Sequence, residues 1–311
     1  MENINTRLSV IICTYNRDYI LSDCLDSLVN QTADKSLYEV IVVNNNSTDR
    51  TQEIALEYVK NDSNFRVVCE SNQGLSYARN RGYFEAQYEW VAYVDDDAKA
   101  DTSFVDRAFS TIEKYKFDCF GGMYYPWYRN SVRPKWLSET FGQSTKFYEE
   151  VTVLTNGYVS GGVCVYKKSA LYSIGGFPLD LGMTGTKIAY GEETYVQNKL
   201  VENGFTIGFD PALCIVHLVP EYKQTLKWHI KAAYAHGRDS VKIFGMAKQN
   251  ITLIKYCKIT MKMVVYNIGG SIVKIMSIKG YYWQNLVLDI IKPLASFNGY
   301  YFEYNKRQKN K

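Results

Sequence analysis

Apolar and polar residues alternate in blocks over the first hundred residues of the chain. Two runs have the composition of buried strands, at residues 8–14 and 39–43, and a third strand is predicted at residues 65–69. A fourth run begins at Trp90. Stretches with helical spacing separate these runs, the first being residues 20–28. Strands that alternate with helices predict an α/β fold with a doubly wound sheet and right-handed crossovers.

The fourth run ends in three consecutive carboxylates, Asp95, Asp96 and Asp97. Ligands of open α/β sheets bind just beyond the carboxyl ends of the strands. Adjacent carboxylates repel one another unless a cation lies among them, and Mn²⁺ or Mg²⁺ suits oxygen ligands that are shared with phosphates. The sequence therefore predicts a metal–diphosphate site here. The alternative is an acidic helix N-terminus, where the helix dipole favours negative charge.

The second half of the chain has a different pattern. Strands are predicted at residues 117–125, 158–166 and 205–216, and the second of them contains Gly161 and Gly162. Glycines inside a strand indicate either a close approach of ligand or backbone or a bulge. Glu192 and Glu193 open a predicted helix, His217 follows the last strand, and a further helix is predicted from about residue 222 to 242.

Charge sets the C-terminal region apart from the rest. Residues 251–311 carry ten Lys and Arg against two Asp and Glu, a net charge of +8, whereas the whole chain has +4. Lys255, Lys258 and Lys262 fall on one helix face among apolar residues, and a second such stretch spans residues 271–279. Basic amphipathic helices of this kind predict peripheral contact with an anionic membrane surface. Packing against the catalytic domain or a second subunit is the alternative.

Several classes of protein are disfavoured. The seven cysteines are scattered without a CxxC pair, which predicts a reducing compartment and argues against zinc and disulfides. The N-terminus is polar until Leu8, and no apolar run reaches the length of about 18 residues that a membrane span needs. GxGxxG, GxxxxGK[ST] and nucleic-acid-binding modules are missing. We therefore expect a cytoplasmic protein at the inner face of the cell membrane that does not bind nucleic acid.

Seven segments in order resemble the bacterial family-2 glycosyltransferases of the GT-A fold over roughly residues 7–220: SVIICTYNR, IVVNNNSTD, NQGLSYARNRG, VAYVDDD, SGGVCVYKKSAL, IGGF and GEETYVQNKL. The resemblance implies a catalytic domain over residues 1–220, with a nucleotide-sugar half at about 1–100 and an acceptor half at about 101–220. Residues 221–311 form a basic, helical extension. The implied fold is a mixed, doubly wound nucleotide-binding sheet that is flanked by helices.

The implied reaction is the inverting transfer of a hexosyl group from a nucleotide-diphosphate sugar to a glycan or lipid-linked acceptor, in surface polysaccharide or glycolipid synthesis. A metal ion assists a single displacement. By resemblance, Asp97 is the direct metal ligand, Asp95 shares the metal or contacts the ribose, and Asp96 could do either. His217 completes the metal site in this interpretation, although a lone histidine is more often structural.

The resemblance also assigns the nucleotide site and the acceptor side. Nucleotide-sugar contacts are expected from Thr14, Tyr15, Asn16, Arg17, Asn45, Gly74, Arg79, Asp95 and Asp96. Asn45 replaces an aspartate that accepts a hydrogen bond from uracil in many members, so UDP is expected first, with dTDP or GDP as alternatives. Acceptor contacts are expected from Trp136, Gly161 and Gly162. Trp136 has plain packing as its alternative, and Arg79 a surface salt bridge.

A catalytic base is needed opposite the leaving group. Glu193 is the candidate by position, and Glu192 stays open because the family usually has Glu-Asp here. Two further functions are weighed. A sugar-nucleotide pyrophosphorylase would show a Gly-rich basic loop after the first strand, where this chain has CTYNRDY. A catalytically inactive nucleotide-sugar-binding module would be expected to have lost its acids, and this chain retains them.

Overall fold

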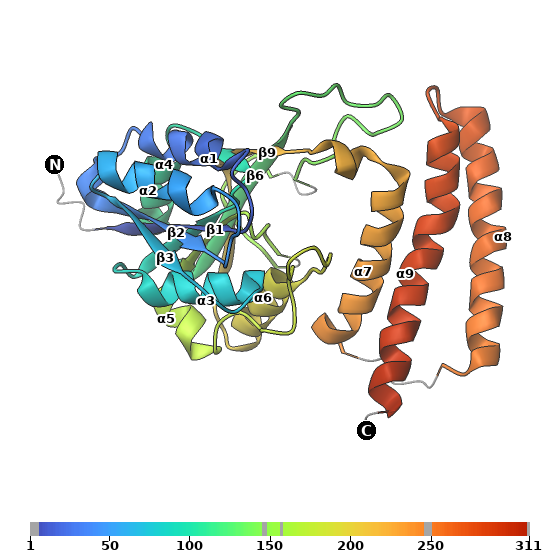
Figure 1. Cartoon of the computed structure of the whole chain (residues 1–311). Coiled ribbons are helices and arrows are strands. Elements are labelled where there is room, and N and C mark those ends of the chain that lie inside the picture. The colour runs from blue at the N-terminus through green and yellow to red at the C-terminus, as the bar shows by residue number, and fades with distance from the viewer. Residues whose placement is uncertain (1–5, 145–147, 156–157, 246–250, 310–311) are drawn as a thin grey trace. The chain divides into compact units, whose positions relative to one another are not determined.

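The computed structural model describes residues 6–144, 148–155, 158–245 and 251–309 (Figure 1). The chain forms two compact units. The first comprises residues 1–127, 142–180 and 192–218, and the second comprises residues 128–141, 181–191 and 219–311. Two loops that the sequence analysis grouped with the catalytic half therefore belong to the second unit.

A single mixed sheet organises the first unit. Its strands are β1 (Leu8–Thr14), β2 (Tyr38–Asn44), β3 (Phe65–Cys69), β4 (Trp90–Val94), β5 (Ala98–Ala100), β6 (Cys119–Trp127), β7 (Thr152–Val153), β8 (Val163–Lys167) and β9 (Ile207–Leu218). The strand order is β3-β2-β1-β4-β8-β6-β9-β5, with β7 beside β9. The first four strands are parallel, as the β-strand and helix alternation predicts, and β8 joins β4 in the antiparallel sense.

Helices cover both faces of this sheet (Figure 1). Side chains of α1 (Leu21–Val29), α2 (Thr51–Asn61) and α4 (Phe104–Lys114) pack with Val10 and Ile12 on one face. Side chains of α3 (Leu75–Glu85), α5 (Lys168–Ser173) and α6 (Glu192–Glu202) pack with Ile11 on the other. Successive residues of β1 are thus buried on opposite faces, which explains why its sequence is continuously apolar. The predicted doubly wound α/β fold is confirmed.

One predicted strand is shorter than its sequence pattern. Residues 158–162 are not part of β8, which begins at Val163. The amide of Val163 donates to the carbonyl of Ser160 at 3.2 Å, so the two glycines lie in a turn before the strand. Local β-propensity is overridden here because the turn is closed by its own backbone hydrogen bond.

The second unit is helical. It contains η2 (Glu221–Gln224), α7 (Leu226–Ile243), α8 (Leu253–Ser277) and α9 (Trp283–Lys309). The hydroxyl of Thr225 caps α7 by accepting from the amide of Trp228. The two basic stretches predicted around residues 251–279 join into the single helix α8. None of the helices in the described ranges combines the length and the apolar content that a membrane span requires.

Helices α7 and α9 approach each other at glycines. A Cβ atom added to Gly237 would collide with the backbone of Ser296, and one added to Gly299 would collide with the backbone of Tyr234. Because both collisions are with backbone atoms, rotation of a neighbouring side chain could not relieve them. The two glycines therefore allow the close packing of these helices, and α8 has no equivalent contact at Gly269, where a Cβ would meet nothing within 4 Å.

We expect Gly299→Ala to lower the free energy of unfolding by about 2 kcal/mol or more, because the added methyl group forces the α7 and α9 backbones apart. The matched control is Gly269→Ala, which should raise it by about 0.5 to 1 kcal/mol through the higher helix propensity of alanine. Urea denaturation of both variants measures the difference. Equal stabilisation by the two substitutions would contradict the close α7–α9 contact.

Candidate active site

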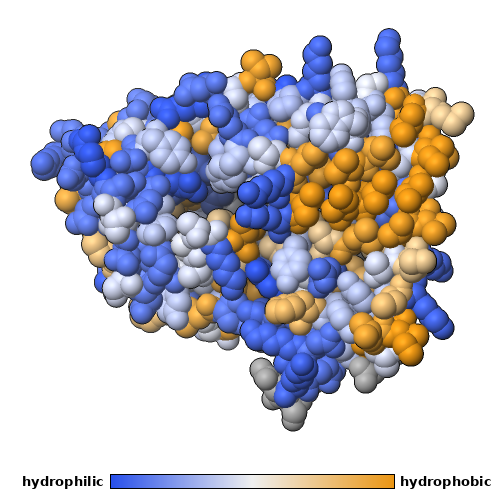
Figure 2. Space-filling view, turned by 45° about the vertical axis from the view of Figure 1, so that its right-hand side comes forward, coloured by the Kyte–Doolittle hydropathy of each residue, from blue (hydrophilic) through white to orange (hydrophobic). Residues whose placement is uncertain are grey.

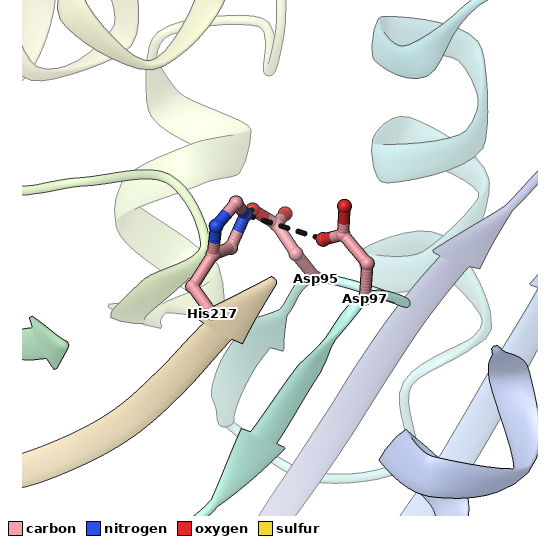
Figure 3. A group of neighbouring side chains, drawn as sticks. All are labelled: Asp95, Asp97 and His217. Carbon is pink, nitrogen blue, oxygen red and sulfur yellow. Dashed lines mark ion pairs between the residues drawn. The ribbon is translucent and has the colours of Figure 1, made fainter. Parts of the chain in front are cut away.

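Three potential metal ligands converge at the carboxyl end of β4 (Figure 3). Asp95 and Asp97 follow β4 directly, and His217 comes from β9, far along the chain. Strand β5 brings them together, because it pairs with β9 and places Ala98 opposite His217. The His217 Nε2 atom lies 3.4 Å from Asp95 Oδ2 and 3.2 Å from Asp97 Oδ1. One ligand atom from each residue falls within 4.8 Å of the others.

This donor set fits a divalent cation. Two carboxylate oxygens and one imidazole nitrogen are ligands that Mn²⁺ accepts readily. Burial alone would raise the pKa of the Asp95 carboxyl, but the hydrogen bond and charge of His217, together with Arg79, hold it below its usual value. The lowered pKa favours the ionised carboxylate, which is the form that ligates a cation. The structure thus brings together the three residues that the sequence analysis named as metal ligands.

Asp96 has different partners. Its Oδ1 atom lies 3.3 Å from Nε of Arg17, which follows β1. Burial raises the pKa of Asp96 to about 6, and the Arg17 charge opposes that rise. The middle carboxylate of the triplet is thus paired with a cation of the β1 turn. Of its two expected roles, this position favours the nucleotide side over metal ligation.

The turn after β1 is held against the turn after β2. These strands are parallel neighbours with Thr14 opposite Asn44, so their carboxyl ends meet. Asn16 adopts a positive φ of 53°. Its amide donates to the Ser47 hydroxyl at 3.0 Å, and its side-chain oxygen accepts from the Thr48 amide at 2.8 Å. The expected nucleotide turn of residues 14–17 is therefore fixed by hydrogen bonds across two strands.

Both the oxygen and the nitrogen of the Asn45 carboxamide form hydrogen bonds within the protein. Its Oδ1 atom accepts from the Gly74 amide at 2.8 Å, and its Nδ2 atom donates to the carbonyls of Glu70 at 3.1 Å and Asn72 at 2.7 Å. Gly74, at φ 149°, is the residue that precedes α3. An aspartate could not donate to two carbonyls, which explains why an amide suits this position. Asn45 braces the loop, and its contact with a base stays a prediction.

Arg79 is a buried cation at the centre of the site, with 4% of its surface exposed. Its Nη1 atom lies 2.5 Å from Glu192 Oε1, and its Nη2 atom lies 3.9 Å from Asp95 Oδ1. The rings of Tyr93 and Phe177 lie against its guanidinium group. The alternative of a surface salt bridge is wrong, because the helix α3 directs this side chain into the protein, where a charge must be paired.

The two glycines at residues 161 and 162 line this centre. A Cβ on Gly161 would lie 2.8 Å from Nη2 of Arg79, and one on Gly162 would collide with the carboxylate of Asp95. Only glycine lets the backbone pass so close to both charged groups. The groups that approach these two glycines are the side chains of Arg79 and Asp95, and the contact of the glycines with an acceptor stays a prediction.

Two adjacent glutamates begin α6 in different surroundings. Glu192 is buried and paired with Arg79. Glu193 is partly exposed, and its Oε2 atom is buried without a hydrogen-bond partner among the residues that the structure describes. Burial and the neighbouring Glu192 charge raise the pKa of Glu193 to about 8, against the opposing effect of Arg79. A carboxyl group whose pKa is raised by burial and by a neighbouring carboxylate is typical of acid–base sites.

Trp136 lies in the second unit. Its carbonyl accepts from Nδ2 of Asn285 at 2.7 Å, and its ring packs edge-on to His229 with centroids 5.5 Å apart. These contacts favour the packing alternative that the sequence analysis gave for this residue.

Sequence reasoning missed Tyr124 of β6. Its ring lies 6.2 Å from the His217 ring, centroid to centroid. Burial, together with the charges of Asp95 and Glu193, raises its pKa. The negative charges of Asp95, a candidate metal ligand, and of Glu193, the candidate base, therefore both act on its hydroxyl. An aromatic residue inside a strand gives no signal of this placement, because only the pairing of β6 with β9 brings it there.

The chain was compared with known proteins. The sequence profile described as glycosyl transferase family 2 matches residues 9–175, more than half of the chain. A poly-β-1,6-N-acetyl-D-glucosamine synthase of Staphylococcus aureus is 25% identical over 232 residues, which cover 71% of this chain and 53% of the synthase. Three other glycosyltransferase relatives are 32% to 36% identical, and the matches span only 22% to 34% of their lengths.

Two solved structures have the same fold. The mannosyltransferase PcManGT from Pyrobaculum calidifontis, in complex with GDP-Man and Mn²⁺, has a TM-score of 0.59 at 17% identity and is matched over 98% of this chain and 85% of its own. S. aureus TarS 1–349 in complex with UDP-GlcNAc has a TM-score of 0.56 at 17% identity, over 98% and 93% of the two chains. These likenesses confirm the GT-A fold. The match to the family profile shows that this chain belongs to glycosyl transferase family 2.

Proposed function

We propose that this glycosyltransferase moves a sugar from a nucleoside-diphosphate donor to a glycan or lipid-linked acceptor by a metal-assisted single displacement that inverts the anomeric carbon. The observation that carries the proposal is the grouping of Asp95, Asp97 and His217 beside the buried Arg79–Glu192 pair. The metal ligands provide for a cation that would bind a diphosphate. The glutamates at the start of α6 provide a carboxylate for a proton transfer.

Asp97, Asp95 and His217 would hold the metal ion. The imidazole nitrogen favours Mn²⁺ over Mg²⁺ as the natural ion, since Mg²⁺ prefers all-oxygen ligands. A bound cation stabilises the negative charge that builds on the departing nucleoside diphosphate. Arg79 orients Asp95 and Glu192, and Arg17 with Asp96 lies at the nucleotide turn. The Mn²⁺ complex of PcManGT supports this assignment.

Glu193 is the proposed base. Its carboxylate has a raised pKa and a buried oxygen without a partner, whereas Glu192 is committed to Arg79. A glutamate with a pKa near the working pH takes the proton of an acceptor hydroxyl more readily than a fully ionised one. Glu192 then acts as a positioning residue through Arg79. Gly161 and Gly162 are proposed on the acceptor side.

The donor nucleotide is proposed to be UDP, with dTDP and GDP as alternatives. The bound UDP-GlcNAc of TarS supports UDP, and the bound GDP-Man of PcManGT supports GDP. Thr14, Tyr15, Asn16 and Gly74 would contact this nucleotide. The relative that is a poly-N-acetylglucosamine synthase supports a role in surface polysaccharide or glycolipid synthesis.

Peripheral contact with the inner face of the cell membrane is proposed through the basic C-terminal helices. Helix α8 exposes long apolar side chains at intervals of three, four and seven residues: Ile254, Met261, Val265, Ile268, Ile272 and Ile275. Figure 2 shows apolar side chains gathered on the side where α8 lies. The net charge of +8 over residues 251–311 complements an anionic surface better than it does a second copy of the same helix.

We expect Mn²⁺ with UDP to raise the melting temperature of the wild-type protein and to have little effect on Asp97→Asn. A ligand at about 100 times its dissociation constant adds roughly 2.7 kcal/mol of stability. Glu113→Gln, on an exposed part of α4, is the matched carboxylate-to-amide control and should behave as wild type. Thermal shifts with UDP, dTDP and GDP, each with and without Mn²⁺, make the measurement. A shift with GDP in place of UDP would overturn the donor assignment.

Glu193→Gln should lower kcat by roughly 10²- to 10⁴-fold because the base is lost, while nucleotide binding remains. Glu192→Gln should instead lower the free energy of unfolding by about 3 kcal/mol, because it leaves the Arg79 charge buried without its partner. Assays of sugar transfer and denaturation of both variants separate the two roles. If Glu193→Gln kept full activity and Glu192→Gln abolished it in a folded protein, the roles would be reversed.

The raised pKa of Glu193 predicts a pH dependence. Below a pH of about 8 its carboxyl holds a proton and cannot act as a base, so kcat/KM should fall as the pH decreases through this value. The folded state binds this proton more tightly than the unfolded state, so its stabilising effect is lost as the pH rises towards 8. Initial rates between mildly acidic and mildly alkaline pH test the profile. A rate that is constant across this range would argue against Glu193 as the base.

A further inference from the structure

Helix α6 buries a carboxamide one turn after the candidate base. Gln197 follows Glu193 by four residues, so the two side chains share a face of the helix. Gln197 is 1% exposed, and its helix neighbours Val196 and Leu200 belong to the apolar core. A polar group at such a depth is costly unless the protein supplies its hydrogen bonds. The partners of Gln197 therefore show what this buried amide contributes.

The carboxamide of Gln197 binds the backbone of one residue at both of its polar groups. Its Oε1 atom accepts from the Val159 amide at 2.8 Å, and its Nε2 atom donates to the Val159 carbonyl at 3.0 Å. Nε2 also donates to the hydroxyl of Tyr166 in β8 at 3.4 Å. Two hydrogen bonds to the amide and the carbonyl of one residue repeat the pattern that joins paired strands. They therefore fix the orientation of Val159 as well as its distance from α6.

The segment around Val159 has further restraints. Gly121 of β6 makes room for it, because a Cβ atom on this glycine would lie 2.5 Å from the Cβ of Val159. The hydrogen bond from the Val163 amide closes the turn that follows. Residues 158–162 lie outside the strands, so they are held by individual contacts and not by a strand ladder. Gln197 contributes two of these contacts from α6.

The same segment borders the charged site. A Cβ atom on either of its glycines would crowd the Arg79 guanidinium or the Asp95 carboxylate. The position of the turn therefore limits where these two side chains can lie. Because Gln197 belongs to the helix of the candidate base, its hydrogen bonds tie that helix to the turn beside a candidate metal ligand.

We propose that Gln197 is a positioning residue for sugar transfer. By holding Val159 it keeps the glycine turn beside Asp95, so the metal ligand and the helix of the base stay at a fixed separation. A site that must be ordered on binding loses affinity, and a displacement needs its reacting groups in line. The proposal rests on the metal site of the proposed function, and it adds a residue that acts only through the groups it holds.

Hydrogen exchange of the metal-free, full-length protein tests whether Gln197 holds the turn. Gln197→Met keeps the length of the side chain and loses both hydrogen bonds to Val159. We expect the amides of residues 159–163 to exchange about tenfold faster in this variant, while those of β1 exchange as in the wild type. Leu200→Ala is the matched control, because Leu200 is fully buried in the same helix and packs in the apolar core. It should lower overall stability without this local effect.

Binding of Mn²⁺ alone tests the effect on the site, measured from the electron paramagnetic resonance signal of the free ion. We expect Gln197→Met to bind Mn²⁺ about tenfold more weakly than the wild type, because groups behind a metal ligand commonly change affinity by such a factor. Leu200→Ala should bind Mn²⁺ as the wild type does. A glutamine that only filled the core would not separate the two variants. If Gln197→Met does not fold, Gln197→Asn, whose amide is one methylene group shorter, takes its place.

Two outcomes would overturn the proposal. One is exchange of residues 159–163 that Gln197→Met leaves unchanged. The other is faster exchange there with an Mn²⁺ affinity equal to that of the wild type or of Leu200→Ala, which would make Gln197 a structural residue only. Failure of the wild type itself to bind Mn²⁺ would instead overturn the metal site of the proposed function. The exchange result would still show whether Gln197 holds the turn, so the two failures are distinguishable.

Discussion

The burial of negative charge around the end of β4 is the constraint on which the rest of the first unit depends. Carboxylates from two segments gather there: Asp95, Asp96, Asp97, Glu192 and Glu193. Like charges at this density cannot all remain ionised in a buried site without cations among them. Arg79 supplies one cation, Arg17 supplies a second, and Nε2 of His217 lies close to two of the carboxylates. Glu193 and Asp96 are left with raised pKa values, so the excess negative charge is relieved by protons that these two carboxyl groups bind.

The scaffold follows from this requirement. A buried arginine needs neighbouring backbone to come close, and the glycines at 161 and 162 make room for Arg79 and Asp95. The loop that leads into α3, the helix of Arg79, is in turn braced by Asn45. Residues that the sequence analysis predicted to contact a ligand thus also maintain the geometry of the charged site around Arg79. A substitution at such a position changes both binding and structure.

The second unit follows a different packing principle. Glycines bring α7 and α9 into backbone contact, so that pair is held by close packing. Helix α8 stacks Tyr256 on Phe297 and Tyr301 of α9, and it leaves many of its other apolar side chains exposed. Such an arrangement is costly in water and becomes favourable when an apolar environment covers the outer face. The same helix therefore carries the proposed membrane contact.

The sequence by itself determined the order and type of the first four strands and of the helices between them, because strand and helix periodicity are local. It also determined which acidic residues follow β4 and open α6. Only the tertiary structure decided that His217 joins Asp95 and Asp97, because the pairing of β5 with β9 brings them together. The same holds for the pairing of Glu192 with Arg79 and for the hydrogen bonds of Asn45. The inward direction of Gln197 likewise depends on Val159, since a helix pattern states which residues share a face but not which face meets a partner.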